Sequence, residues 1–333
     1  MLFRSTDVIV VGSGCSGAMA AQTLVEKGVK VNLIDVGIKN LEYENKIPEG
    51  SFEKIRQSET QQHIPFLGND FESLEFNDSK SGAQLTPPRK HLVQLSGDLL
   101  QIQSKTFFPV ESLAYGGLGA GWGLGCCVYS DNELQQCSLD VTSMHAAYEI
   151  IAQRMGISAD ANDNASVYTI GKVQHHLPPL DLDETKFLLE KFNRNKNKFN
   201  HLDFFLGRPA LALLSHDFDG RKATRYDDMH FYRDAGKSAY RPQLTIEKLI
   251  GHSNFKMSPM QLVLSYKEIE DGVEVTCVHV ETHEKSTFRA RKLVLAAGAL
   301  SSARIVLRSR NISSELSFLC NPYTYYPCLN PFM

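Results

Sequence analysis

Residues 7–17, with the sequence DVIVVGSGCSG, lead an apolar run directly into a glycine-rich turn. The run has no charge after Asp7, as expected for a strand that is buried on both faces. The next stretch, CSGAMAAQTLVEK, has its apolar residues at helical spacing and ends before Gly28. A second apolar run, VKVNLID at 29–35, completes a strand–helix–strand unit. This order predicts a parallel sheet and therefore an α/β fold.

The turn contains the pattern G-x-G-x-x-G at Gly12, Gly14 and Gly17, and Asp35 ends the next strand. In dinucleotide-binding folds such glycines allow a tight turn and a close approach to a pyrophosphate, which faces the start of the helix. Asp35 is suited to accept hydrogen bonds from ribose hydroxyls and disfavours a 2′-phosphate. A glycine turn also joins strands to helices without any ligand, and this pattern does not choose between FAD and NAD.

Two later segments resemble the glucose-methanol-choline family of FAD-dependent oxidoreductases. GGLGAGWG at 116–123 is similar to the loop that passes beside the flavin in that family, where glycines let the main chain approach a flat ring. LVLAAGALSSAR at 293–304 is similar to the family's strand-to-helix element. Some members carry a histidine before the loop tryptophan that bonds covalently to the flavin. Gly121 stands there in this sequence, so the resemblance implies non-covalent FAD.

The resemblance also implies a strand residue that meets adenine through its main chain, and the register favours Val263. A core position explains this valine more simply, because β-branched residues fill strands. The glycine loop and the AAGA turn likewise have purely structural explanations, as a flexible loop and as tight packing. The predicted cofactor-binding residues are Gly12, Gly14, Cys15, Ser16, Gly17, Asp35, Gly116, Gly117, Gly121, Trp122, Gly123, Val263, Ala297 and Gly298.

The domain organisation follows from the return of the chain to its first sheet. QLVLSYKEIE and VEVTCVHV flank Asp271 and Gly272, a pair that favours a tight hairpin turn and so predicts a β-meander. We expect a Rossmann-like FAD-binding domain at 1–139 and 236–312, with a lid-like insertion at about 38–92. A mixed α+β substrate or cap lobe is expected at 140–235, and 313–333 is predicted to start an incomplete C-terminal segment.

The resemblance implies oxidation of an alcohol CH–OH group by hydride transfer to flavin N5, with a histidine pair handling the hydroxyl proton. The substrate class includes sugars, sterols and other small alcohols, and the electron acceptor is left open. No histidine follows Ala303, so no catalytic residue is assigned. Two alternatives therefore stay open: a truncated FAD-binding protein without alcohol oxidation, and an NAD-linked dehydrogenase.

Composition limits the other possibilities. A formal net charge of -3 with mixed signs gives no reason to expect a nucleic-acid partner. The seven cysteines form no C-x-x-C pair, which favours a reducing compartment and no metal site. The N-terminus lacks a signal-peptide pattern, and no apolar run approaches the roughly 18 residues of a membrane helix. We therefore expect a cytoplasmic protein that binds small molecules, in an oligomeric state that the sequence does not indicate.

Overall fold

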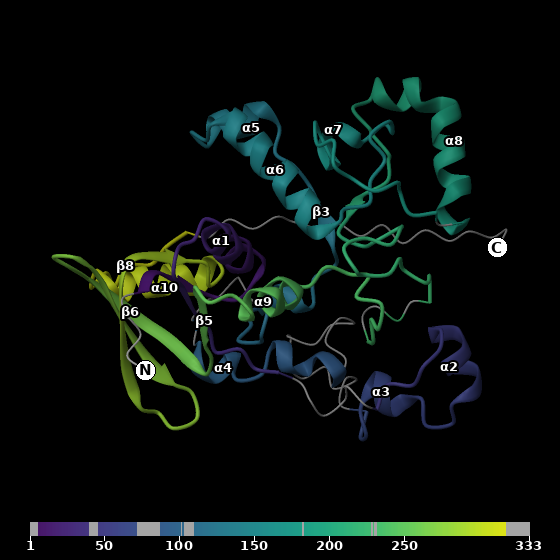
Figure 1. Cartoon of the computed structure of the whole chain (residues 1–333). Helices are drawn as coiled ribbons and strands as arrows, with labels where there is room; N and C mark the ends of the chain where they lie inside the picture. Colours follow the sequence, from purple (N-terminus) through teal and green to yellow (C-terminus); the bar gives the residue numbers. More distant parts are fainter. Residues whose placement is uncertain are drawn as a thin grey trace.

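The computed structural model describes residues 6–39, 46–71, 87–100, 102, 110–181, 183–227, 229 and 232–317 (Figure 1). Most of the expected C-terminal segment, 318–333, lies outside these residues, as do 40–45 and 72–86 of the predicted insertion. Within them the fold is α/β, as the sequence predicts.

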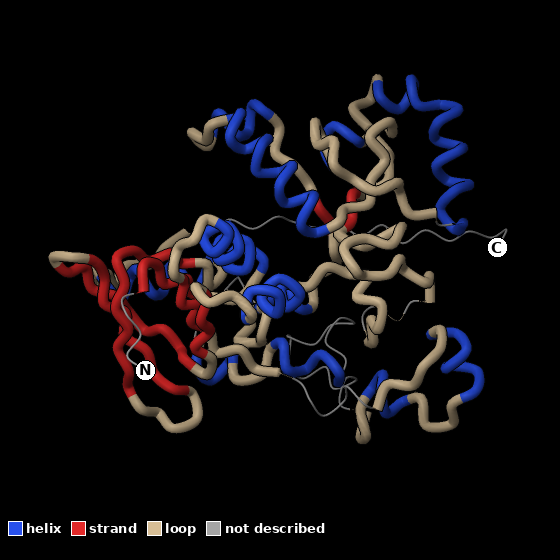
Figure 2. The backbone as a smooth tube through the Cα atoms, viewed as in Figure 1, coloured by secondary structure: helices blue, strands red, loops and turns tan. Residues whose placement is uncertain are grey.

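One mixed sheet, drawn in red in Figure 2, organises the described residues. Its strands follow the order β5-β2-β1-β8-β7-β6. Strands β5, β2, β1 and β8 run parallel, and β8, β7 and β6 form an antiparallel meander. The strands are β1 (Thr6–Val11), β2 (Val31–Ile34), β5 (Phe255–Ser258), β6 (Gln261–Ile269), β7 (Gly272–His279) and β8 (Lys285–Leu295). Val10 pairs with Leu33 on one side and Val294 on the other, so the last long strand returns beside the first.

Helices cover both faces of the sheet, which explains the uninterrupted apolar runs. Val8 and Val10 of β1 pack in a cluster with residues of α1 (Cys15–Glu26) and α9 (Pro242–Ile250). Ile9 and Val11 point to the other face, where they share a cluster with the meander and α10 (Ala299–Ser309). Because successive strand residues alternate between faces, a strand buried on both sides needs apolar residues throughout.

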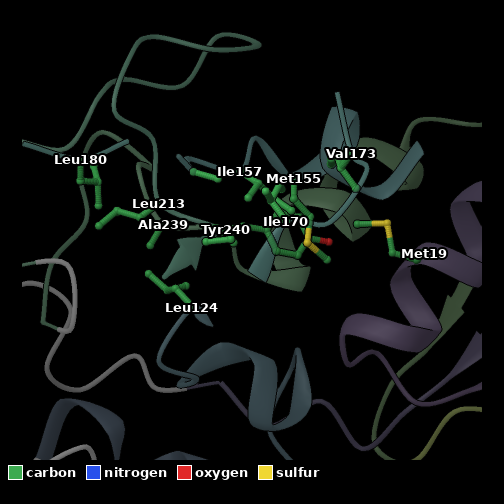
Figure 3. Packing of buried hydrophobic residues seen from close by; sticks show 14 residues of the cluster. Met19, Leu124, Met155, Ile157, Ile170, Val173, Leu180, Leu213, Ala239 and Tyr240 are labelled. Carbon is green, nitrogen blue, oxygen red and sulfur yellow. The ribbon is translucent and has the colours of Figure 1, made fainter. Parts of the chain in front are cut away.

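A second group of elements lies beyond the sheet. It comprises β3 (Gly125–Cys126), α5 (Asp131–Gln136), α6 (Val141–Met155), α7 (Ser166–Thr169), α8 (Asp183–Asn200) and β4 (Ala210–Leu211), where β3 and β4 pair antiparallel. Their core includes Leu124, Met155, Ile170 and Tyr240, and Met19 of α1 joins it (Figure 3). Met19 therefore connects this group to the helix that follows the fingerprint.

The predicted insertion contains short helices. They are α2 (Phe52–Ser58), α3 (His63–Leu67) and η2 (Pro87–Leu92), followed by α4 (Ser96–Leu99) and, in the glycine loop, η3 (Gly117–Ala120). Ile55 and Phe66 pack with Met229, and Arg233 pairs with Glu49 at 2.8 Å. The insertion thus contacts residues that follow the second group, while its role as a lid stays a prediction.

Within the described part of the chain, none of the helices is both long and apolar enough to cross a bilayer.

Candidate functional site

A cavity of 520 Å³ lies at the C-terminal ends of β1 and β2. Ligands of open α/β sheets bind in such a crevice, and the volume is typical of a ligand pocket. The fingerprint, the glycine loop and the turn after β8 all line it, although more than 90 residues separate each from the next. The predicted residues that line it are Gly12, Gly14, Cys15, Ser16, Asp35, Gly117, Trp122, Val263, Ala297 and Gly298.

The fingerprint turn requires glycine for two separate reasons. Gly12 has a φ of +102°, and a Cβ there would lie 2.4 Å from the main-chain oxygen of Ala296, in the turn after β8. A Cβ on Gly17 would lie 1.9 Å from the main-chain oxygen of Gly12. These glycines therefore bring the start of α1 against two strand ends.

The start of α1 suits an anionic ligand. Its first turn carries no acidic residue, and the cap residue Gly14 has no side chain that would occupy the free N–H groups. Both Gly14 and Ser16 line the cavity. Unpaired N–H groups and the positive end of the helix dipole favour a phosphate at this position.

Asp35 and Ser13 form a small network beneath the turn. The main-chain N–H of Ser13 donates to the Asp35 carboxylate at 2.5 Å, and the Ser13 hydroxyl accepts from the N–H of Gly116 at 2.8 Å. Burial raises the pKa of Asp35 to about 6, because the charged carboxylate is desolvated. Sequence reasoning identified Asp35 but missed Ser13, whose buried hydroxyl ties the fingerprint to the glycine loop.

Several predicted glycines lie outside the cavity wall. A Cβ on Gly116 would come within 2.7 Å of the Gln243 side chain, and one on Gly121 within 2.2 Å of Leu92. Gly123 is exposed, and nothing lies within 4 Å of an added Cβ. Gly116 and Gly121 therefore serve the packing behind the loop.

Hydrogen bonds from behind hold the glycine loop in place. The indole N–H of Trp122 donates to the carbonyl of Tyr240 at 3.0 Å. Arg241 donates to the carbonyl of Trp122 at 2.8 Å, and Arg89 donates to that of Ala120 at 3.0 Å. The loop is therefore fixed although it is rich in glycine.

An ion pair forms part of the cavity wall. Arg304 of α10 contacts the Glu111 carboxylate with both terminal nitrogens, at 2.7 and 3.2 Å, and Ser301 donates to the same carboxylate at 2.8 Å. Bidentate pairs of this kind fix orientation as well as charge. All three residues line the cavity. The sequence did not indicate Glu111 as a site residue, because its partner Arg304 lies far away in the chain.

Val263 has two environments at once. Its side chain is 6% exposed and packs in the cluster of Ile9 and Val11, while the residue also lines the cavity. The pairing of β6 with β7 shifts register directly after Val263. Contact of its main chain with adenine stays a prediction.

No histidine among the described residues lines the cavity. His145 pairs with Asp131 at 2.7 Å, and His175 pairs with Glu149 at 2.7 Å, both in the group of elements beyond the sheet. The structure therefore adds no candidate for the base, as the sequence analysis also found none.

Comparison with known proteins connects this geometry to a cofactor. Residues 5–42 match the model of an FAD binding domain. The matched stretch contains β1, the fingerprint, α1, β2 and Asp35. It confirms FAD as the predicted cofactor, which the fingerprint alone did not distinguish from NAD. A search of curated proteins returned no match.

Solved structures show the same fold. A crystal structure of formate oxidase has a TM-score of 0.50 and 13% identity, covering 92% of this chain and 49% of that one. Pyridoxine 4-oxidase from Mesorbium loti has a TM-score of 0.47 and 16% identity, covering 91% and 51%. The chain thus spans about half the length of these proteins. The likeness to formate oxidase confirms the predicted Rossmann-like α/β fold.

Proposed function

We propose that this chain is the FAD-binding part of an oxidoreductase that acts on a small alcohol, with FAD held non-covalently in the 520 Å³ cavity. The observation that carries the proposal is the meeting of the three separated segments around that cavity. A glycine turn explains any one of them alone, but not their convergence on one site. When bound, FAD supplies the hydride acceptor, flavin N5.

Different residues of the chain are proposed to bind different parts of FAD. The start of α1 is proposed to face the pyrophosphate, and Asp35 to accept from ribose hydroxyls. The main chain at Val263 is proposed to meet adenine. Gly117 and the turn at Ala297 are proposed to let the main chain approach the ring system, where a side chain would exclude it.

Non-covalent attachment is proposed because Gly121 stands where some members of the resembling family carry a bonding histidine. A Cβ at this position would lie 2.2 Å from Leu92, so a side chain there would collide with packed protein. Acid precipitation of the FAD-loaded protein tests whether attachment is non-covalent. We expect all flavin in the supernatant, and flavin that stays with the precipitated protein would contradict non-covalent attachment.

FAD binding is tested by titrating the purified full-length chain with FAD and following the quenching of flavin fluorescence. We expect saturable binding that Asp35→Ala weakens. Asp271→Ala is a matched control, because Asp271 lies in the exposed turn between β6 and β7. Absence of binding after reconstitution, or equal loss in both variants, would overturn the proposed site.

A second candidate function is FAD binding without alcohol oxidation. It is favoured by the absence of histidine among the described residues that line the cavity. Anaerobic mixing of the flavin-loaded protein with sugar, sterol and short-chain alcohols separates the two. Bleaching of the flavin by any of them supports the oxidoreductase, whereas bleaching by dithionite alone supports the second candidate.

A further inference from the structure

Helix α8 and the turn that follows it expose an unusual amount of apolar surface. Leu202 is 74% exposed, Leu188 55% and Phe204 52%. We define the α8 patch as Tyr168, Leu188, Phe199, Leu202, Phe204 and Phe205, all of which are exposed. In Figure 1 the helix lies at the outer edge of the molecule, far from the sheet. Exposed apolar patches of this kind mark interaction surfaces.

Ring contacts join the aromatic residues of the patch in two sets. Phe192, which is only 4% exposed, has its ring 5.4 Å from that of Phe199, and the Phe199 ring lies 5.7 Å from that of Phe204. Tyr168 of α7 contacts Phe205 at 5.6 Å. The rings therefore hold one another in place and form a preformed surface.

The same helix carries a net positive charge. Residues 183–200 contain five Lys or Arg and three Asp or Glu, and two of the three acidic residues lie in the first turn, whereas the whole chain carries a net charge of -3. Lys191, Arg194 and Lys198 recur at helical spacing on one stripe of α8, and all three are exposed. Lys191 lies over the Phe187 ring at 4.4 Å, and none of the three forms an ion pair with a described residue. Their charge is therefore available to an anionic surface.

We propose that the α8 patch binds the surface of an anionic lipid bilayer, with the rings at the level of the acyl boundary and the cations on the headgroups. An interfacial helix combines Phe and Leu on one side with Lys and Arg on the other. Protein interfaces, in contrast, are depleted in Lys, and Lys supplies two of the three cations on this stripe. Long Lys side chains also extend their charge toward headgroups while their stems stay on apolar surface.

Sedimentation of the full-length chain with vesicles tests the proposal. We expect binding to vesicles of phosphatidylcholine with 30–40% phosphatidylserine, a range of roughly one charge in three lipids that gives a strong surface potential. Binding to phosphatidylcholine alone is expected to be much weaker. Added salt is expected to reduce binding, since screening shortens the range of the surface potential.

Two sets of variants separate the charge from the apolar surface. The triple change Lys191→Gln, Arg194→Gln and Lys198→Gln is expected to weaken binding roughly 100-fold. The matched control changes Lys267, Lys285 and Lys292 of the meander to Gln, which removes the same charge from an exposed surface elsewhere and is expected to leave binding within about 3-fold.

The apolar variant is Leu202→Ser with Phe204→Ser, expected to weaken binding at least about 10-fold. Leu316→Ser, at a position 60% exposed, is its control. Far-ultraviolet circular dichroism of each variant verifies folding. Equal binding to neutral and anionic vesicles overturns the proposal, and so does equal loss in the control triple. A dimer that the apolar variant dissociates, without vesicle binding, assigns the patch to a second copy instead.

Discussion

The Glu111–Arg304 ion pair offers a quantitative test of the cavity wall. The pair joins the segment before the glycine loop to α10, and its side chains are 11% and 15% exposed. Glu111→Gln or Arg304→Gln leaves one buried charge without its partner, which costs about 3 kcal/mol of unfolding free energy at such burial. In the double variant neither charge remains. We therefore expect a coupling energy of about 2 kcal/mol between the two changes.

A second pair serves as the control for this cycle. Arg289 and Glu274 of the meander form an ion pair at 2.8 Å, but Arg289 is 74% exposed. Solvent screens this pair, so its coupling is expected below about 1 kcal/mol. Urea unfolding followed by circular dichroism measures both cycles, with FAD affinity as a second readout. Equal coupling in the two pairs would refute the view that burial strengthens the first one.

Three further predictions concern the fingerprint. Ser13→Ala removes the acceptor of a buried main-chain N–H of the glycine loop, so thermal or urea unfolding should show a loss of about 1–3 kcal/mol together with weaker FAD binding. The raised pKa of Asp35, about 6, means that most of its carboxyl groups are ionised only above that pH. FAD affinity measured by fluorescence should therefore fall about 10-fold from pH 8 to pH 5. The unfolding free energy of the FAD-free protein should change in the opposite direction and decrease as the pH rises through 6. Asp35→Asn should abolish both effects. Gly17→Ala places a Cβ 1.9 Å from a main-chain oxygen and should cost more than about 3 kcal/mol, whereas Gly123→Ala, with nothing within 4 Å, should stay within about 0.5 kcal/mol by the same unfolding measurement.

The parts of the fold that follow from local pattern were predictable from the sequence. The strand–turn–helix at 6–26 and the β6–β7 hairpin around Asp271 match the expected elements closely. Each has a strong apolar period and a turn residue with few conformational alternatives. Strand β5 was missed because its sequence, FKMS, offers only four residues and no period. Helices α2 and α3 fall in the predicted insertion and are too short for a helical pattern to emerge from the sequence.

Contacts between distant residues were not predictable. Ser13 and Gly116 are 103 residues apart, and Glu111 and Arg304 are 193 apart. Nothing in the neighbourhood of Glu111 marks it as the partner of an arginine in α10. Each contact depends on β8 returning beside β1. In a single sequence this return is indicated only by the resemblance of its motifs to those of a known family.

The glycines of the predicted site have two different structural roles, which the sequence motif alone does not distinguish. Gly14 and Gly117 line the cavity, and the nearest atoms to an added Cβ lie at 3.8 and 3.5 Å, so their open side faces the site. Gly17, Gly116 and Gly121 face packed protein, where an added Cβ would collide at 1.9–2.7 Å. Changes at the second set act on folding and reach FAD affinity only through it. Gly14 gives the cleaner test of the proposed contact with the cofactor, because its φ of -64° suits any residue. Gly117 has a φ of +54°, where a side chain would also strain the main chain.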